Sequence, residues 1–217
     1  MFTVPEAARL LQVAPSTLAY WLDGGVRAGR TYRPVIRTEP TPGAGVTWAE
    51  FVESGLLRAY RTHHVPMREL RAFIDLLRGQ LGVPYPLADR RPFVADKQLV
   101  LQAQEESDLG ADYCLVAVVR GQLILTPPAE DFVERVTWDG DLAARWRPHA
   151  DPDSPVRMDP QRRFGRPAVG GVSTEVLWEQ VQAGEDAQSV AEAFDLTDQD
   201  VHWAVNYETS VRAARAA

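Results

Sequence analysis

Four arginines within eleven residues form the part of this sequence best suited to binding a charged ligand. They are Arg27, Arg30, Arg33 and Arg37, and Glu39 is the single acidic residue close behind them. Guanidinium groups bind phosphate oxygens through paired hydrogen bonds, so this cluster is typical of a surface that contacts a nucleic acid backbone. A hairpin that is merely solvated is the alternative, and the excess of positive charge favours phosphate binding.

The residues before these arginines predict two short helices joined by a tight turn. Thr3 and Glu6 have the spacing of a capping box, and Pro15 suits the first turn of a helix that extends to about Leu22. Apolar residues occupy one side of this second helix, and its other side could contact base edges and phosphates. The polar residues on that outward side are Ser16, Thr17 and Tyr20.

The first eighty or so residues resemble the MerR-like winged helix-turn-helix family. The order of elements is similar, with an arginine-bearing wing whose tip is Pro40 to Gly45 and further helices that begin at Thr47 and Pro66. The resemblance implies binding to operator DNA, and because operators are usually bound by symmetric dimers we expect a homodimer. Members usually carry an arginine in the second helix and another after the wing, where this chain has Ala19 and the apolar residues 46–48. Three helices that pack together without contacting DNA are the alternative.

Residue types that could support catalysis are present without the spacing that catalysis needs. His63 and His64 are adjacent on a predicted turn and have no third ligand nearby, and the acidic residues between 131 and 141 occupy turn and outward strand positions. The only cysteine, Cys114, excludes a disulfide framework. With no nucleophile-base set and no phosphate loop, we predict a protein that is not an enzyme and has no cofactor and no metal.

Charge is unevenly distributed along the 217 residues, whose net charge is −7. Residues 1–92 hold 12 arginines and 8 acidic residues, a charge of +4, and residues 93–217 hold the remaining 11 basic and 22 acidic residues, a charge of −11. Contact with DNA is therefore expected in the first half. No apolar run approaches the length of a membrane span, so we expect a cytoplasmic protein without membrane contact.

An α+β fold with three domains follows from the change in pattern along the chain. We predict a winged helix-turn-helix domain over residues 1–86, a small antiparallel β unit over 87–158 and a trihelical domain over 159–217. Hairpin turns are expected at Arg120-Gly121 and Asp139-Gly140. The expected strands are Gln98 to Ala103, Tyr113 to Val119, Gln122 to Thr126, Phe132 to Trp138 and Leu142 to Trp146.

The C-terminal residues predict a Gly/Pro-bearing entry followed by three helices, over 174–183, 187–194 and 197–208. They resemble a small trihelical domain of antitoxins in VapBC-like toxin-antitoxin systems. Many members have an arginine after the second entry glycine, where this chain has Val172. The matching residues are Gly165, Pro167, Gly171, Gly184, Glu185, Asp200, Val201 and Ala204.

The third of these helices carries the residues that we expect to bind a partner. Trp203, Tyr207 and Val211 recur at steps of four and form an apolar stripe, which either packs within the chain or anchors an interface. Arg212 and Arg215 follow the stripe and could enter an acidic active site, and a helix cap or simple solvation is the alternative role.

The two resemblances together imply an antitoxin of a type II toxin-antitoxin system. Such a protein would bind and neutralise a PIN-like ribonuclease toxin and would repress its own operon by binding DNA. The alternative is a MerR-like transcriptional regulator that responds to a small ligand.

Overall fold

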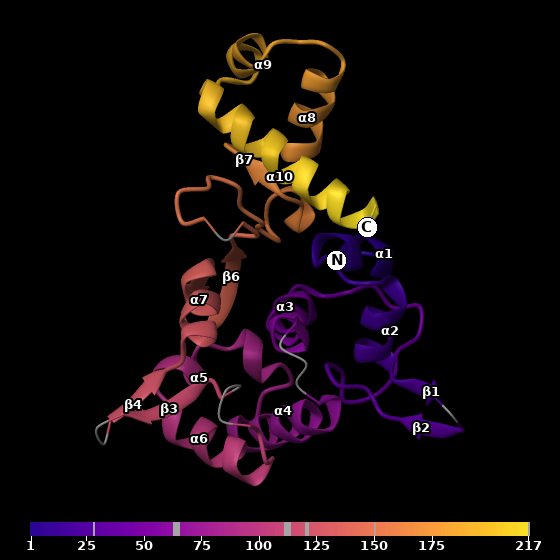
Figure 1. Ribbon diagram of the computed structural model, residues 1–217, viewed down its shortest axis with the longest axis vertical. Helices are drawn as coiled ribbons and strands as arrows, with labels where there is room; N and C mark the ends of the chain where they lie inside the picture. Colours follow the sequence, from indigo (N-terminus) through magenta and orange to yellow (C-terminus); the bar gives the residue numbers. More distant parts are fainter. Residues whose placement is uncertain (28, 63–65, 111–113, 120–121, 150, 217) are drawn as a thin grey trace. The chain divides into compact units, whose positions relative to one another are not determined.

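The computed structural model describes residues 1–217 except 28, 63–65, 111–113, 120–121, 150 and 217. The chain forms two compact units (Figure 1). The first unit comprises Phe2–Glu134 and Trp138–Ala143, and the second comprises Arg135–Thr137 and Ala144–Ala217, together with Met1. The division into three domains at residues 86 and 158 remains a prediction. The expected α+β class is confirmed, because helices alternate with small antiparallel two-stranded sheets.

Helices α1 (Val4–Leu10) and α2 (Pro15–Asp23) begin the first unit and pack against each other. The Thr3 hydroxyl oxygen accepts from the backbone N–H of Glu6 at 3.3 Å, which is the expected helix cap. Leu18 and Leu22 of α2 are fully buried. The turn between the two helices is short because Gln12 adopts a left-handed backbone conformation, with φ at 53°.

The predicted wing is shorter than expected. Strands β1 (Gly25–Arg27) and β2 (Arg30–Tyr32) pair antiparallel, with Gly25 opposite Tyr32 and Arg27 opposite Arg30. The turn of this hairpin therefore lies between residues 27 and 30, and the prediction that Pro40 to Gly45 forms its tip is wrong. Those residues belong to an irregular segment that ends where Val46 forms an isolated β-bridge with Phe2.

Helices α3 (Trp48–Thr62) and α4 (Met67–Leu81) complete the core of this part of the unit. Both are strongly amphipathic, and their buried residues recur at spacings of three and four. Gly82 ends α4 in the left-handed conformation that favours glycine. The main buried apolar residues of the two helices are Phe51, Val52, Leu56, Leu57, Leu70, Phe73, Ile74 and Leu77.

The region predicted as a β unit combines helices with short strands. Short helices η1 (Pro86–Ala88) and α5 (Arg91–Val94) lead into α6 (Lys97–Glu106), so the strand predicted at Gln98 to Ala103 is wrong. Val100, Ala103 and Gln104 are buried at helical spacing. Gln104 joins α6 to the next strand, because its side-chain oxygen accepts from Leu115 N at 2.6 Å and its amide donates to Val116 O at 2.9 Å.

Two separate hairpins replace the single sheet that we predicted. Strands β3 (Val116–Val119) and β4 (Gln122–Leu125) pair with each other, and the predicted Arg120-Gly121 turn lies outside the described residues. Helix α7 (Pro127–Arg135) occupies the first half of the segment predicted as a strand at Phe132 to Trp138. Strands β5 (Val136–Asp139) and β6 (Leu142–Trp146) form the second hairpin, with Gly140 at its turn.

The second unit contains the hairpin β7 (Ala168–Val169) and β8 (Val172–Ser173), the 3-10 turn η3 (Arg163–Gly165) and three helices (Figure 1). The helices are α8 (Thr174–Gln182), α9 (Ala187–Phe194) and α10 (Asp198–Ala216), and α10 continues past its expected end at Glu208. Asp186 caps α9, and Thr197 shares a reciprocal pair of cap bonds with Asp200 at the start of α10. The core of the second unit includes Val156, Val169, Leu177, Val190, Ala191, Val201 and Ala204.

Candidate functional site

The outward side of α2 presents neutral groups. Ser16 is exposed and Thr17 and Tyr20 are half-buried, whereas Leu18 and Trp21 on the other side are buried. Hydroxyl groups at these three positions can donate to and accept from base edges and phosphate oxygens. Because α2 carries no cationic side chain, any charge that binds a phosphate backbone must come from neighbouring elements.

The hairpin that follows α2 supplies part of this charge. Arg30 and Arg33 are exposed, whereas the side chain of Arg27 lies outside the described residues. The ring of Tyr32 meets that of Tyr20 edge to face, with centroids 6.3 Å apart, so the hairpin is held against the outward side of α2. The structure therefore brings Arg30 and Arg33 onto elements that adjoin the predicted recognition helix.

A further arginine, Arg71 of α4, joins this group and was missed in the sequence. Its guanidinium donates to Tyr20 Oη at 3.5 Å and to the carbonyl of Arg33 at 3.2 Å. Arg71 follows the buried Leu70 in the sequence, so the pattern places it beside the apolar face of α4 without saying what it contacts. We use the name DNA-facing group for these residues because DNA contact is the role predicted for this region from the sequence. The group comprises Ser16, Thr17, Tyr20, Arg30, Arg33 and Arg71.

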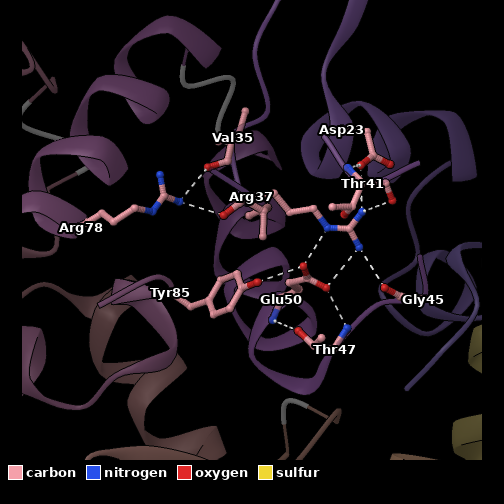
Figure 2. Close-up of polar contacts among 10 residues, drawn as sticks. Asp23, Val35, Arg37, Thr41, Gly45, Thr47, Glu50, Arg78 and Tyr85 are labelled. Atoms are coloured by element: carbon pink, nitrogen blue, oxygen red, sulfur yellow. Dashed lines mark hydrogen bonds and ion pairs between the residues drawn. The ribbon is translucent and has the colours of Figure 1, made fainter. Parts of the chain in front are cut away.

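Arg37 occupies a different environment from the other predicted phosphate-binding residues. Only 6% of it is exposed, and its guanidinium lies in a network that Figure 2 shows. Nε donates to Glu50 Oε1 at 2.8 Å, and Nη1 donates to Asp23 Oδ1 at 2.8 Å. The remaining bonds go to the carbonyls of Thr41 and Gly45, at 3.2 Å and 2.9 Å. We therefore remove Arg37 from the predicted DNA-contacting residues, because its hydrogen-bonding donors are directed inward.

Glu50 connects the ion pair to the start of α3. Its Oε2 accepts from Thr47 N at 2.8 Å while its own N–H donates to Thr47 Oγ1 at 3.3 Å, which completes the predicted capping box. The hydroxyl of Tyr85 donates to Oε1 at 3.1 Å (Figure 2). Burial alone would raise the pKa of Glu50, but the hydrogen bonds from Arg37 and Thr47 hold it below its ordinary value.

Arg78 of α4 supports the same segment from the other side. Its Nη2 donates to the carbonyls of Val35 and Ile36, at 3.3 Å and 2.8 Å, and its Nη1 lies 2.7 Å from Asp75 Oδ1. Val35 and Ile36 are completely buried. Arg37 and Arg78 thus fix the irregular segment that follows the hairpin, and this segment connects β2 to α3.

The three residues of the predicted partner-binding stripe differ in their burial within the second unit. Tyr207 and Val211 are 3% exposed and belong to the core of the three helices, so for these two residues the structure matches the alternative of packing within the chain. Trp203 is half-buried, and its ring lies edge to face with that of His149 at 5.3 Å. Of the three stripe residues, Trp203 is the one that retains partial access to solvent.

Arg212 is held by neighbours from α8 and α10. Its guanidinium lies 4.0 Å from the centroid of the Trp178 ring, 3.5 Å from Glu175 Oε1 and 3.4 Å from Glu208 Oε2. Arg212 therefore joins α10 to α8, a role that differs from both a helix cap and simple solvation. The side chain of Arg215 lies outside the described residues.

Two further observations concern metal sites and membrane-spanning helices. Within the described residues, no three His, Cys, Asp or Glu side chains gather into a group that could hold a metal ion. In the same part of the chain, none of the helices combines the length and the apolar character of a membrane span.

Comparisons with known proteins give relatives that span nearly the whole chain, and one of them is classed as an antitoxin. That protein is "Putative antitoxin VapB45" of Mycobacterium tuberculosis, which is 29% identical over 91% of this chain and 89% of its own length. An uncharacterized protein of the same organism, Rv2308, is 28% identical over 99% of this chain and 92% of its own. No family model matches.

The fold also occurs in a solved structure. The crystal structure of Rv2018 from M. tuberculosis superposes with a TM-score of 0.77 and 26% sequence identity. The match covers 94% of this chain and 96% of that one. The two chains therefore share their architecture over almost their full lengths.

Proposed function

We propose that this chain is the antitoxin of a type II toxin-antitoxin system and that it represses its own operon. The observation that carries the proposal is the similarity to VapB45, which extends over 91% of this chain and therefore includes both compact units. An antitoxin of this kind acts by binding, without catalysis of its own.

The DNA-facing group is the proposed operator contact. Ser16, Thr17 and Tyr20 would contact base edges and phosphates from α2, and Arg30, Arg33 and Arg71 would neutralise phosphates beside it. Arg27 precedes Arg30 in the same hairpin and belongs to the proposal on its position in the sequence. Binding as a homodimer would place two such groups on a symmetric operator.

The second unit is the proposed toxin-binding part, and the proposed toxin is a PIN-like ribonuclease. Trp203 is the proposed anchor, because an aromatic side chain with partial solvent access can bury further area in an interface. A nuclease of this type has an acidic active site, which a guanidinium could enter. Arg215 is the proposed inhibitory cation, since Arg212 would first have to leave Glu175 and Glu208.

Coexpression tests the antitoxin proposal directly. The product of the neighbouring gene would be induced in a bacterial host with and without this chain, and growth, copurification and cleavage of cellular RNA would be measured. We expect growth arrest that this chain relieves, together with a stable complex. A neighbouring product that is harmless and does not bind the chain, combined with operator binding by the chain alone, would contradict the proposal and indicate a transcriptional regulator.

A further inference from the structure

A short antiparallel ladder at the entry to the second unit aligns several arginines on one face. Trp146 pairs with Met158, and Arg157 pairs with Ala168. Trp146 and Met158 are 7% and 1% exposed, so this face of the ladder is buried. Side chains alternate along a strand, so the residues on either side of the buried positions lie on the opposite face. Arg145 and Arg157 are therefore brought together by the same register that builds the core.

The opposite face of the ladder borders a cavity of about 160 Å³, which we call the arginine pocket. An engineered cavity of roughly 150 Å³ accommodates a benzene-sized molecule, so a small ionic group fits this volume. Four of the lining residues are arginines, and only one is acidic, which gives the lining a charge of +3. The pocket is lined by Arg145, Pro155, Arg157, Asp159, Arg162, Arg166, Ala168, Gly170 and Gly171.

The one carboxylate of the pocket is already engaged. Asp159 Oδ2 lies 3.0 Å from Arg145 Nε, and its Oδ1 accepts from the N–H of Gln161 at 2.9 Å. Arg157 donates to the carbonyls of Ser154 and Val156, which fixes the direction of its guanidinium. Among the lining residues, Asp159 is thus the single carboxylate beside four arginines.

Arg162 is exposed, and its guanidinium has no ion-pair or hydrogen-bond partner among the residues that the structure describes. Burial and the nearby charge of Arg147 lower the pKa of Arg157, so an anion beside it would relieve an unfavourable environment.

The backbone keeps one wall of the pocket open. Gly171 has a φ of 87°, and a Cβ atom built on it would meet nothing within 4 Å. Its carbonyl accepts from Arg163 Nε at 3.0 Å, which places a further guanidinium-bearing residue next to the lining. The space beside Gly171 is therefore not filled by a neighbouring side chain.

We propose that the arginine pocket binds a phosphate group, either from a nucleic acid backbone or from a small phosphate ester. A phosphate offers several oxygens that radiate from one centre, so it can accept from three guanidiniums at once, whereas a carboxylate offers two oxygens in one plane. This site goes beyond the proposed function, which gives the second unit a protein partner and locates the operator contact in the first unit.

The segment that contains the arginine pocket differs in charge from the three helices that follow it. Residues 144–172 carry six arginines and three acidic residues, whereas residues 173–211 carry nine acidic residues and no lysine or arginine. A phosphate would thus be attracted to the ladder and repelled by the three helices. Within the second unit, the segment that lines the arginine pocket is therefore the part whose charge favours phosphate.

Calorimetric titration of the purified full-length chain with inorganic phosphate tests the proposal. The double variant Arg162→Ala/Arg166→Ala removes two guanidiniums of the lining, and Arg162→Lys/Arg166→Lys retains their charge without the fork geometry. Arg68→Ala, at an exposed position of α4, is the control for the loss of one positive charge elsewhere. Circular dichroism and unfolding midpoints would verify that each variant folds.

We expect the unaltered chain to bind phosphate saturably. The double alanine variant should bind phosphate at least tenfold more weakly, and the lysine variant should show a smaller loss. Arg68→Ala should leave phosphate affinity unchanged. A parallel titration with a DNA duplex of unrelated sequence identifies the source. A loss of DNA affinity, with a salt dependence lower by about two units of slope, supports the backbone of a nucleic acid. Unchanged DNA binding beside weakened phosphate binding supports a small phosphate ester.

Three results would overturn the proposal. In the first, the unaltered chain does not bind phosphate saturably. In the second, Arg68→Ala weakens phosphate binding as much as the double alanine variant does. In the third, no phosphate binding is seen but the double alanine variant captures the toxin more weakly. The last result would assign the pocket to carboxylates of a protein partner. Phosphate titration needs neither toxin nor operator, so it gives its answer whether or not the antitoxin proposal holds.

Discussion

Thr174 and Glu208 form a buried hydrogen bond that joins the first and last helices of the second unit. The Thr174 hydroxyl donates to Glu208 Oε1 at 2.6 Å, and the two residues are 0% and 2% exposed. Arg212 Nη2 lies 3.4 Å from Glu208 Oε2. The carboxylate at the centre of this contact thus depends on a hydroxyl from α8 and a cation from its own helix.

Replacement of Thr174 by Val should destabilise the chain by about 1–3 kcal/mol, because it leaves a buried carboxylate oxygen without its donor while it preserves side-chain shape. Chemical denaturation followed by circular dichroism measures the effect. Ser210→Ala is the control, since its hydroxyl donates only to the carbonyl of Tyr207 on the same helix, at 2.7 Å. Equal costs for the two substitutions would show that the Thr174 to Glu208 bond contributes nothing specific.

Arg37→Ala should cost about 3–5 kcal/mol of stability, because it leaves Glu50 buried without its cation. Arg33→Ala removes the same charge from an exposed position and should change stability by no more than about 0.5 kcal/mol. Denaturation midpoints of the two variants provide the comparison. An Arg37→Ala protein of normal stability with impaired DNA binding would return Arg37 to the operator contact.

Operator binding should respond to substitution in the DNA-facing group. Arg30→Ala and Arg33→Ala should each reduce the slope of log affinity against log salt by about one unit, because each proposed phosphate contact releases about one counterion. Fluorescence anisotropy at several salt concentrations measures the slope, with Arg68→Ala as the matched loss of charge. Slopes that stay constant for both hairpin variants would exclude these arginines from the contact.

Stability should fall as pH rises between the pKa values of Glu53 in the unfolded and folded states. Burial raises the pKa of Glu53 from 4.5 to about 8, a hydrogen bond from Leu87 N opposes the rise, and Oε2 has no hydrogen-bond partner among the described residues. Between these two values the folded state binds a proton that the unfolded state lacks. The stabilisation is therefore complete below pH 4.5, decreases towards pH 8 and is absent above it.

The Glu53 contribution amounts to at most about 5 kcal/mol across that range. Urea denaturation at pH 5, 6.5 and 8 measures it, and Glu53→Gln should flatten the dependence because the amide does not titrate. Glu69→Gln, on the less buried first turn of α4, is the control. A pH dependence that persists unchanged in Glu53→Gln would assign it to other groups.

Substitutions in α10 should separate binding from folding. Trp203→Ala should weaken toxin capture and should cost less stability than a substitution within the core, because the ring is half-buried at the edge of the core and meets His149 edge to face. Tyr207→Ala should instead cost about 3–5 kcal/mol, since this residue lies in the core of the unit. Surface plasmon resonance with the copurified toxin and denaturation of the chain alone provide the two readouts. Unchanged toxin affinity in Trp203→Ala would remove the proposed anchor.

Local signals in the sequence predicted helix starts well. Thr3, Thr47 and Asp186 cap helices where expected, because a capping bond joins residues two or three positions apart and needs no tertiary information. The strand expected at Gln98 to Ala103 failed because its apolar residues suit either period over so short a run. Packing of α6 against α4 selects the helix, and this contact lies far outside any local window.

The candidate sites also depend on contacts between residues that are distant in the sequence. In the sequence, Arg37 belongs to the same arginine cluster as Arg30 and Arg33. In the structure it is buried because it forms ion pairs with Glu50 and Asp23, which lie 13 and 14 residues away. The arginine pocket was missed because residues 148–163 have the Pro, Asp and Arg content of a linker. The pairing of Arg157 with Ala168 gives this segment the alternation of a strand, and that pairing cannot be inferred from composition.

The network around Arg37 has a consequence for local opening of the chain. Asp23 Oδ1 accepts from both Arg37 and the backbone N–H of Thr41, while Glu50 holds Arg37 and the first turn of α3 (Figure 2). An irregular segment would ordinarily exchange its amide hydrogens rapidly with solvent. Here the amides of Thr41 and Thr47 can exchange only when a shared set of charges separates. They should therefore exchange together with the start of α3 as one cooperative unit, although no regular secondary structure connects them.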